Sequence, residues 1–237
     1  MLCGVAKENQ QLSLNLRTPA HWGGPRVGAG RSRCPRARVP HRRREAVDAK
    51  HPCHVTFKVR RELRSLRSRR LVRELERTLA DVRNRRFFRV VHYSVQRDHL
   101  HLVVETEGSE QLSRGLKSVG ARIARAVNRT FGRAGAVLLD RAHVRTLKTP
   151  TEVRRALAYV LLNARRHAAQ RGRSLPRLGV IDPASSGRWF DGWLDAVPLP
   201  ADSPVVACPR SWLLRLGWKR AGLISCVEVP GGRRRAR

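Results

Sequence analysis

Acidic residues are scarce in this chain, and that scarcity limits what the protein can do. Its 237 residues include 50 Lys and Arg against 18 Asp and Glu, a formal net charge of +32. A surplus of this size exceeds what solubility requires. It predicts a polyanionic partner, with nucleic acid first and an anionic membrane surface a distant second. Most of the surplus is arginine, whose planar fork suits phosphates and guanine edges.

Paired cysteines and long apolar runs are also missing. The five cysteines are scattered and form no C-x-x-C pair, so we expect neither a zinc knuckle nor a disulfide framework. No run of about 18 apolar residues occurs, which predicts that the chain has no membrane span. The first residues lack the basic-then-apolar order of a signal peptide. These absences, with the charge, predict a cytoplasmic protein associated with the nucleoid.

Composition divides the chain into three parts. Residues 1–50 are rich in Gly, Pro and Arg and predict a disordered basic arm, which either lies in a DNA minor groove or only attracts phosphates. Residues 51–170 alternate between strand and helix patterns and form the expected domain. Residues 171–237 form an extension with a basic tail. Its short apolar patches should pack on the main domain, although tryptophans can also stack on unpaired bases. This extension holds four of the five tryptophans: Trp189, Trp193, Trp212 and Trp218.

The first half of the expected domain contains three strands and a helix. Alternating, β-rich residues predict a strand over 54–60. Leucines at threes and fours then predict a helix over 61–84, with one break in the period. The stretch 87–105, FFRVVHYSVQRDHLHLVVE, reads as two short strands joined by a polar turn.

The second half adds two helices and a further strand. Ser109 is expected to cap a helix that ends at Gly132, with its apolar residues on one stripe. Residues 136–148 read as a fourth strand or strand pair. Thr151 is expected to cap a helix that runs to about Gln170.

The order of these elements predicts an α+β fold. It matches a ferredoxin-like split β-α-β antiparallel sheet with helices on one face, plus a C-terminal helix that carries a tyrosine. This arrangement should leave the other sheet face for a substrate.

A histidine pair lies on the strand that ends near residue 105. Residues two apart in a strand point to the same face, so His99 and His101 should lie side by side. Leu100, Leu102 and Val104 should point into a core. Two imidazoles one strand step apart can bind a divalent metal or hold a phosphate. The alternative is a pair of histidines on a solvated face.

The helix expected after residue 151 places a tyrosine among charges. Tyr159 and Asn163 are four residues apart and share the face opposite the apolar stripe. Glu152, Arg155 and Arg166 lie on that same face. The tyrosine hydroxyl should therefore emerge among arginines, where a phosphate is attracted and a phenolate is favoured.

Tyrosine is rare in this chain, which narrows the choice of nucleophile to two residues. Tyr93 lies among the alternating Val91 and Val95 of a strand, so we expect it to be a packing residue. Tyr159 is then the candidate nucleophile.

These features together resemble the HUH single-tyrosine transposases, in particular the REP-associated tyrosine transposases. The segment HYSVQRDHLHLVVE is similar to the metal-binding strand pair of that family. The segment AYVLLNARRH is similar to its tyrosine helix, where the family often has Tyr-Ile-x-x-Asn-Pro. Ala164 replaces the proline. The resemblance covers roughly residues 51–169.

The resemblance implies an enzyme that cleaves and rejoins single-stranded or hairpin DNA at palindromic repeats. Tyr159 would form a 5′-phosphotyrosine, and His99, His101 and Asn163 would hold Mg²⁺ or Mn²⁺. Two imidazoles are borderline ligands for Mg²⁺, which favours Mn²⁺ in vitro. The enzyme would act as a monomer or homodimer. Five basic residues are candidates for binding DNA: Arg97, Arg145, Lys148, Arg155 and Arg166.

Two other functions remain open at this point. The first is a non-catalytic protein that is derived from a transposase and binds DNA hairpins. The second is an RNA-binding protein of ribosomal type, which would need exposed aromatic residues on its central strands. Here the strand before the histidine pair offers only His92 or Tyr93.

Overall fold

A computed structural model of the chain describes residues 44–198 and 200–231. The basic arm expected over 1–50 and the basic C-terminal tail lie almost wholly outside the described residues. The described part contains an antiparallel sheet of five strands in the order β2-β3-β4-β1-β5. The strands are β1 (Cys53–Lys58), β2 (Asn84–Arg85), β3 (Phe88–Val95), β4 (His99–Thr106) and β5 (His143–Thr146).

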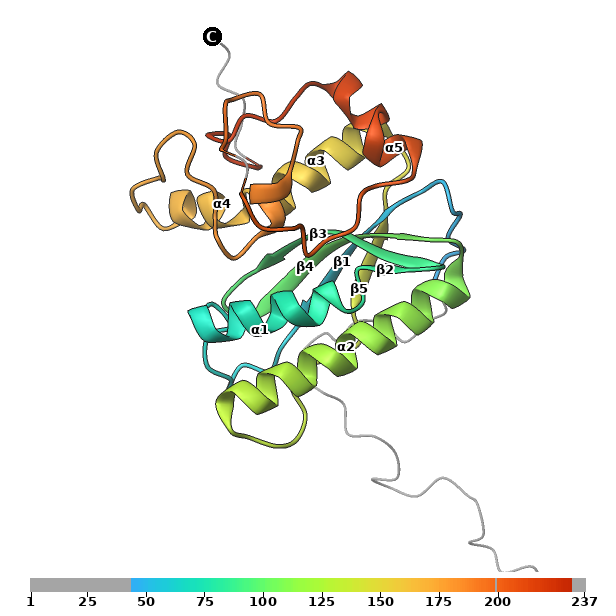
Figure 1. Ribbon diagram of the computed structural model, residues 1–237, viewed down its shortest axis with the longest axis vertical. Helices are drawn as coiled ribbons and strands as arrows, with labels where there is room; N and C mark the ends of the chain where they lie inside the picture. Colours follow the sequence, from blue (N-terminus) through green and yellow to red (C-terminus); the bar gives the residue numbers. More distant parts are fainter. Residues whose placement is uncertain (1–43, 199, 232–237) are drawn as a thin grey trace, which may run out of the picture. The chain divides into compact units, whose positions relative to one another are not determined.

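Without the two-residue β2, this strand order is that of the split β-α-β fold, so the predicted α+β class is confirmed. Helices α1 (Arg69–Ala80) and α2 (Ser109–Phe131) cover one face of the sheet (Figure 1). The main core lies between them and the sheet. Leu100, Leu102 and Val104 of β4 belong to this core and are fully buried, as their alternation predicted.

Helix α1 begins later than predicted. The leucine period suggested a start near residue 61, but the helix starts at Arg69, where the Ser68 hydroxyl accepts a hydrogen bond from the amide of Leu71. Leu63 and Leu66 precede the helix, and Leu66 is nevertheless fully buried. Leu66 is buried although it lies in a loop, so the apolar period of the sequence extends beyond the helix itself.

Helix α2 agrees with its prediction except at the first residue. Its apolar stripe is buried, and it ends at Gly132, which adopts the left-handed conformation with φ of 60°. The N-cap is Gly108 rather than Ser109, and no side chain caps the helix. The Ser109 hydroxyl instead accepts a hydrogen bond from the amide of Val47.

The second face of the sheet is not left open, so that expectation is wrong. Helices α3 (Pro150–Leu161) and α4 (Asn163–Gln170) and the extension lie on this side (Figure 1). Val91 and Val103 of the sheet pack with the apolar residues of α3 and form a second core. A β-bulge between Val90 and His92 interrupts the alternation, so that His92 faces this side together with Val91. The extension adds η1 (Ser186–Trp189), α5 (Trp212–Arg215) and η2 (Gly217–Ala221).

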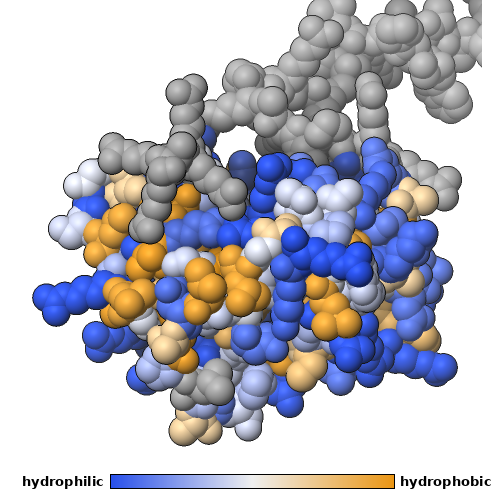
Figure 2. Space-filling view, turned by 90° about the horizontal axis from the view of Figure 1, so that it is seen from above, coloured by the Kyte–Doolittle hydropathy of each residue, from blue (hydrophilic) through white to orange (hydrophobic). Residues whose placement is uncertain are grey.

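The extension packs against the domain through apolar contacts and is also held by ion pairs and hydrogen bonds. Trp218 is buried in the second core, whereas Trp212 is about half exposed. Arg154 of α3 binds both carboxylate oxygens of Glu228, at 2.7 and 2.6 Å. Glu105 of β4 accepts hydrogen bonds from the amides of Arg210 and Ser211. Figure 2, which looks down on this side, shows apolar patches separated by hydrophilic side chains.

No helix in the described ranges combines the length and apolar character needed to cross a membrane. Cys53, Cys208 and Cys226 are free thiols, and the first and last of them are buried.

His92 makes the stability of this fold depend on pH. Its Nδ1 lies 3.2 Å from the Ser186 hydroxyl, its ring packs against Phe190, and burial lowers its pKa to about 4. The unfolded chain binds a proton here below a pKa of 6.5, but the folded chain does so only near 4. Stability contributed by the neutral imidazole is therefore lost as the pH falls through that window.

We expect His92→Gln, which cannot titrate, to abolish roughly 3 kcal/mol of the stability loss between about pH 7 and about pH 4. Urea unfolding at both pH values measures this difference. If variant and wild type lose the same stability on acidification, His92 is not a source of the pH dependence.

Candidate active site

The pairing of β1 with β4 brings together the first residues of the candidate site. Thr56 lies opposite His101 in the register, and His54 lies opposite Val103. The side chains of His54 and Thr56 share one face of β1 because they are two residues apart. His54 Nε2 and the Thr56 hydroxyl each lie 3.1 Å from His101 Nδ1. Two groups from β1 therefore fix the orientation of the His101 ring.

The predicted histidine pair lies on one face of β4. The ring centroids of His99 and His101 are 4.6 Å apart, which confirms the period-two prediction. His99 is partly buried, and its Nδ1 lies 2.8 Å from a carboxylate oxygen of Asp98. The alternative of two solvated histidines does not hold for His101, which is 4% exposed.

Helix α3 brings Tyr159 to these histidines. The tyrosine ring centroid lies 5.1 Å from that of His101 and 5.7 Å from that of His54. The guanidinium of Arg166 lies 4.9 Å from the centre of the tyrosine ring. The sequence prediction thus placed Tyr159 correctly beside an arginine, and the fold brings it to the histidine pair.

The start of α3 is set by Thr149, so the expected cap at Thr151 is wrong. The Thr149 hydroxyl accepts a hydrogen bond from the Glu152 amide, and the Glu152 carboxylate accepts one from the Thr149 amide. Pro150 occupies the first helical position, where its missing N–H is not needed. Glu152 also pairs with Arg145 of β5 at 3.1 Å, which ties the helix to the sheet edge.

The predicted single helix to residue 170 is broken. Leu162 leaves the helical conformation, with φ of −109° and ψ of 18°, and separates α3 from α4. The ring of His167 on α4 lies 6.3 Å from that of His99. Asn163 is the first residue of α4 and lies four residues before His167, whereas the break at Leu162 separates it from Tyr159.

Asn163 is not on an exposed polar face, as the helical wheel suggested. It is 0% exposed, and neither atom of its side-chain amide has a hydrogen-bond partner among the described residues. The wheel placed Asn163 and Tyr159 together but could not show that Asn163 is fully buried while Tyr159 remains partly exposed. A buried amide without a partner costs free energy, so its retention points to a ligand.

Burial keeps two of the histidines neutral. Burial, followed by the neighbouring His54 and His99, lowers the pKa of His101 to about 2. Burial, followed by His143 and Arg145, lowers the pKa of His54 to about 4. Neutral imidazole is the form that binds a metal.

Two buried atoms without a hydrogen-bond partner, one on His101 and one on Asn163, are of the types that could bind a divalent metal. His101 Nε2 is buried without a partner, while its Nδ1 is held by β1. With Nδ1 protonated, Nε2 presents its lone pair. The Asn163 oxygen is the second donor without a partner. Within residues 44–198 and 200–231, no three His, Cys, Asp or Glu side chains form a metal site. A metal set that includes His99 and His101 would therefore need a ligand of another type, such as the Asn163 amide.

A groove of about 1050 Å³ opens beside Tyr159. Of the predicted DNA-binding residues, Arg145 and Arg155 line it and are exposed. Arg166 lies over Tyr159. Lys148 and Arg97 are exposed but are not among the residues that line the groove. Glu152 and Glu228 also line the groove and pair with Arg145 and Arg154, so Arg155 and Arg166 supply the positive charge next to the partly exposed phenol.

Three residues of the site were missed by the sequence prediction. His54 and Thr56 come from β1, and only the strand pairing reveals that they contact His101. The sequence did contain a signal for His167, because this residue lies four positions after Asn163 in the same helical pattern. The two-residue spacing of His54 and Thr56 also marked a shared polar face.

Tyr93, the other tyrosine of the described chain, is a packing residue as predicted. It is fully buried, and its hydroxyl donates to Glu76 at 2.6 Å. Burial and this carboxylate raise its pKa. His92 is also buried, so the aromatic surface needed for the RNA-binding alternative is absent from β3.

No protein-family model matches the chain, and no curated protein does. Solved structures do. A REP-associated tyrosine transposase bound to a REP hairpin is 16% identical, with a TM-score of 0.45 over 57% of this chain and 76% of that one. A bacterial tRNA(His) guanylyltransferase-like protein in complex with ATP is 10% identical, with a TM-score of 0.41 over 54% and 64%. A candidate transposase from Deinococcus radiodurans R1 is 15% identical, with a TM-score of 0.34 over 53% and 92%. All are distant matches.

The unpartnered amide of Asn163 generates a stability prediction. Asn163→Leu keeps a similar shape and removes two buried polar atoms, so we expect the variant to gain about 1–3 kcal/mol in the free energy of unfolding. Urea unfolding without added metal measures this gain. A loss of stability would mean that the fold itself satisfies the asparagine.

Proposed function

We propose that this protein cleaves and rejoins DNA strands, with Tyr159 as the nucleophile. The observation that carries this proposal is the position of Tyr159 against His101, beneath Arg166 and in a groove that Arg155 also lines. A partly exposed phenol beside neutral imidazoles and arginines can meet a phosphodiester. The sequence resemblance to single-tyrosine transposases supports the same reaction.

The proposed reaction forms one bond and breaks another. Tyr159 Oη attacks the scissile phosphorus in line, and the bond from phosphorus to the 3′-oxygen breaks. The phenol loses its proton, and the departing 3′-oxygen gains one, which frees a 3′-hydroxyl. Tyr159 then carries the 5′-phosphate as an ester. A second 3′-hydroxyl reverses the step at a new junction without ATP, because the ester retains the bond energy.

His99, His101 and Asn163 would hold Mg²⁺ or Mn²⁺. A bound divalent cation supplies Lewis-acid stabilisation of the charge that develops on the phosphate. His54 and Thr56 act through His101, because their contacts with Nδ1 direct Nε2 to the ligand position. Arg166 and Arg155 attract the phosphate and orient it toward the tyrosine.

Replacing the nucleophile tests the proposal directly. Tyr159→Phe removes only a hydroxyl, so the fold and hairpin binding should persist while cleavage and the covalent protein–DNA adduct disappear. A denaturing gel with single-stranded DNA and Mn²⁺ detects both, and peptide mapping locates the adduct.

Tyr93→Phe is the matched control, since it removes the other described phenol hydroxyl from the core. Assayed below its Tm, it should still form the adduct. An adduct in Tyr159→Phe, or one mapped elsewhere, would overturn the assignment. A wild type that binds hairpins and never forms an adduct would favour the non-catalytic alternative.

The ligand assignment predicts an effect on metal affinity. Thr56→Val removes a partner of His101 Nδ1, so Mn²⁺ affinity should fall roughly 10–100-fold. His101→Ala should abolish Mn²⁺ binding and cleavage while most DNA affinity remains. The electron paramagnetic resonance signal of free Mn²⁺ measures binding without activity. Thr106→Val, at the far end of β4, is the control and should bind as wild type. If Thr56→Val bound Mn²⁺ as tightly as the wild type, Thr56 would not position His101.

A further inference from the structure

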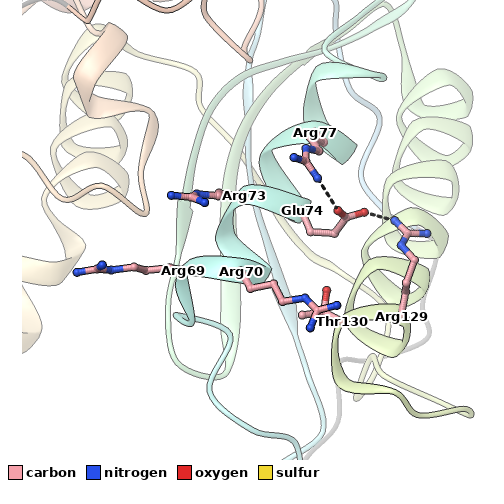
Figure 3. A pocket seen from close by; sticks show the side chains of 7 residues that line it. All are labelled: Arg69, Arg70, Arg73, Glu74, Arg77, Arg129 and Thr130. Atoms are coloured by element: carbon pink, nitrogen blue, oxygen red, sulfur yellow. Dashed lines mark hydrogen bonds and ion pairs between the residues drawn. The ribbon is translucent and has the colours of Figure 1, made fainter.

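A second basic surface lies on the opposite face of the sheet from Tyr159. It is a groove of about 660 Å³ between α1 and the end of α2 (Figure 3). We call it the α1–α2 basic groove. It is lined by Arg69, Arg70, Arg73, Glu74, Arg77, Arg129 and Thr130.

The charge of this groove is mostly uncompensated. Glu74 is the only acid that lines it, and its carboxylate bonds to both Arg77 and Arg129, as the dashed lines in Figure 3 show. Three further arginines form no ion pair with any described residue: Arg69, Arg70 and Arg73. The lining therefore carries an excess of four positive charges.

This arrangement of arginines destabilises α1. Arg69 and Arg70 occupy the first turn, which contains no acidic residue, although a helix N-terminus favours negative charge. Arg69, Arg73 and Arg77 follow one another at four-residue spacing, where like charges repel. Internal stability therefore does not explain the cluster, whereas an external polyanion does.

The shape and composition of the groove indicate which polyanion it fits. Four-residue steps along α1 rise about 6 Å, and Arg69 and Arg73 extend one step apart on the same side of the helix, whereas Arg77 turns to Glu74 (Figure 3). No aromatic side chain lines the groove. Single-stranded nucleic acid is bound largely by stacking on aromatic rings, whereas a duplex is held through its phosphates.

We propose that the α1–α2 basic groove binds the phosphate backbone of duplex DNA. The proposal rests on the proposed function for the choice of DNA. The protein would then hold a paired stem on one face of the sheet and the strand to be cleaved on the other. This groove contributes affinity and no chemistry, because it lies across the sheet from Tyr159.

A pair of triple variants tests the groove. The first is Arg69→Gln, Arg70→Gln and Arg73→Gln. The matched control is Arg215→Gln, Lys219→Gln and Arg220→Gln, which removes the same charge from exposed residues of α5 and η2 on the other side of the sheet. Fluorescence anisotropy in EDTA measures binding of a fully paired DNA hairpin and of single-stranded oligo-dT over a range of salt concentrations.

We expect the groove variant to bind the hairpin at least about tenfold more weakly than the control, with a salt slope shallower by roughly two to three. Its affinity for oligo-dT should match that of the control. Its Tm should equal or exceed that of the wild type, because repulsion within α1 is relieved. On saturating DNA, its cleavage rate should match that of the wild type.

Equal hairpin affinity in the two triple variants would overturn the proposal, since only net charge would then matter. A comparable loss for oligo-dT would overturn the duplex assignment. Absence of cleavage by the wild type would instead contradict the proposed function, and it leaves the anisotropy result intact because that measurement contains no metal.

Discussion

The register between β1 and β4 is the constraint on which the candidate site depends. It places Thr56 opposite His101 and brings His54 within hydrogen-bond distance of the same ring. A slip of one residue would turn His101 into the core and Leu102 toward the tyrosine. The burial of Val55 and Leu102 excludes that slip. Hydrophobic burial on one face of the sheet thus sets imidazole geometry on the other.

Local patterns were enough to predict the fold class. Alternation identified the strands, and the apolar stripe identified α2 and its glycine end. Errors arose where a local signal had two explanations. Leu63 and Leu66 continued the helical period while lying in a loop. Thr149 and Thr151 are both possible caps, and the combination of Pro150 with Glu152 three residues after Thr149 distinguishes them.

The same reasoning predicted only part of the candidate site. Tyr159, His99 and His101 follow from the sequence and its resemblance to a known family, because each lies in a short recognisable segment. His54 could not be assigned, since its partner is 47 residues away and only the strand pairing joins them. The burial of Asn163 was missed for a related reason. A helical wheel gives the direction of a side chain and not what covers it.

The way the extension is attached has a consequence for folding during synthesis. Glu105 on β4 receives its amide donors from residues as much as 106 positions later, and Arg154 on α3 binds a carboxylate 74 positions later. The apolar side of α3 that packs against Trp218 therefore stays uncovered until nearly the whole described chain has left the ribosome. Nascent chains halted before residue 218 would expose this surface and be prone to aggregate.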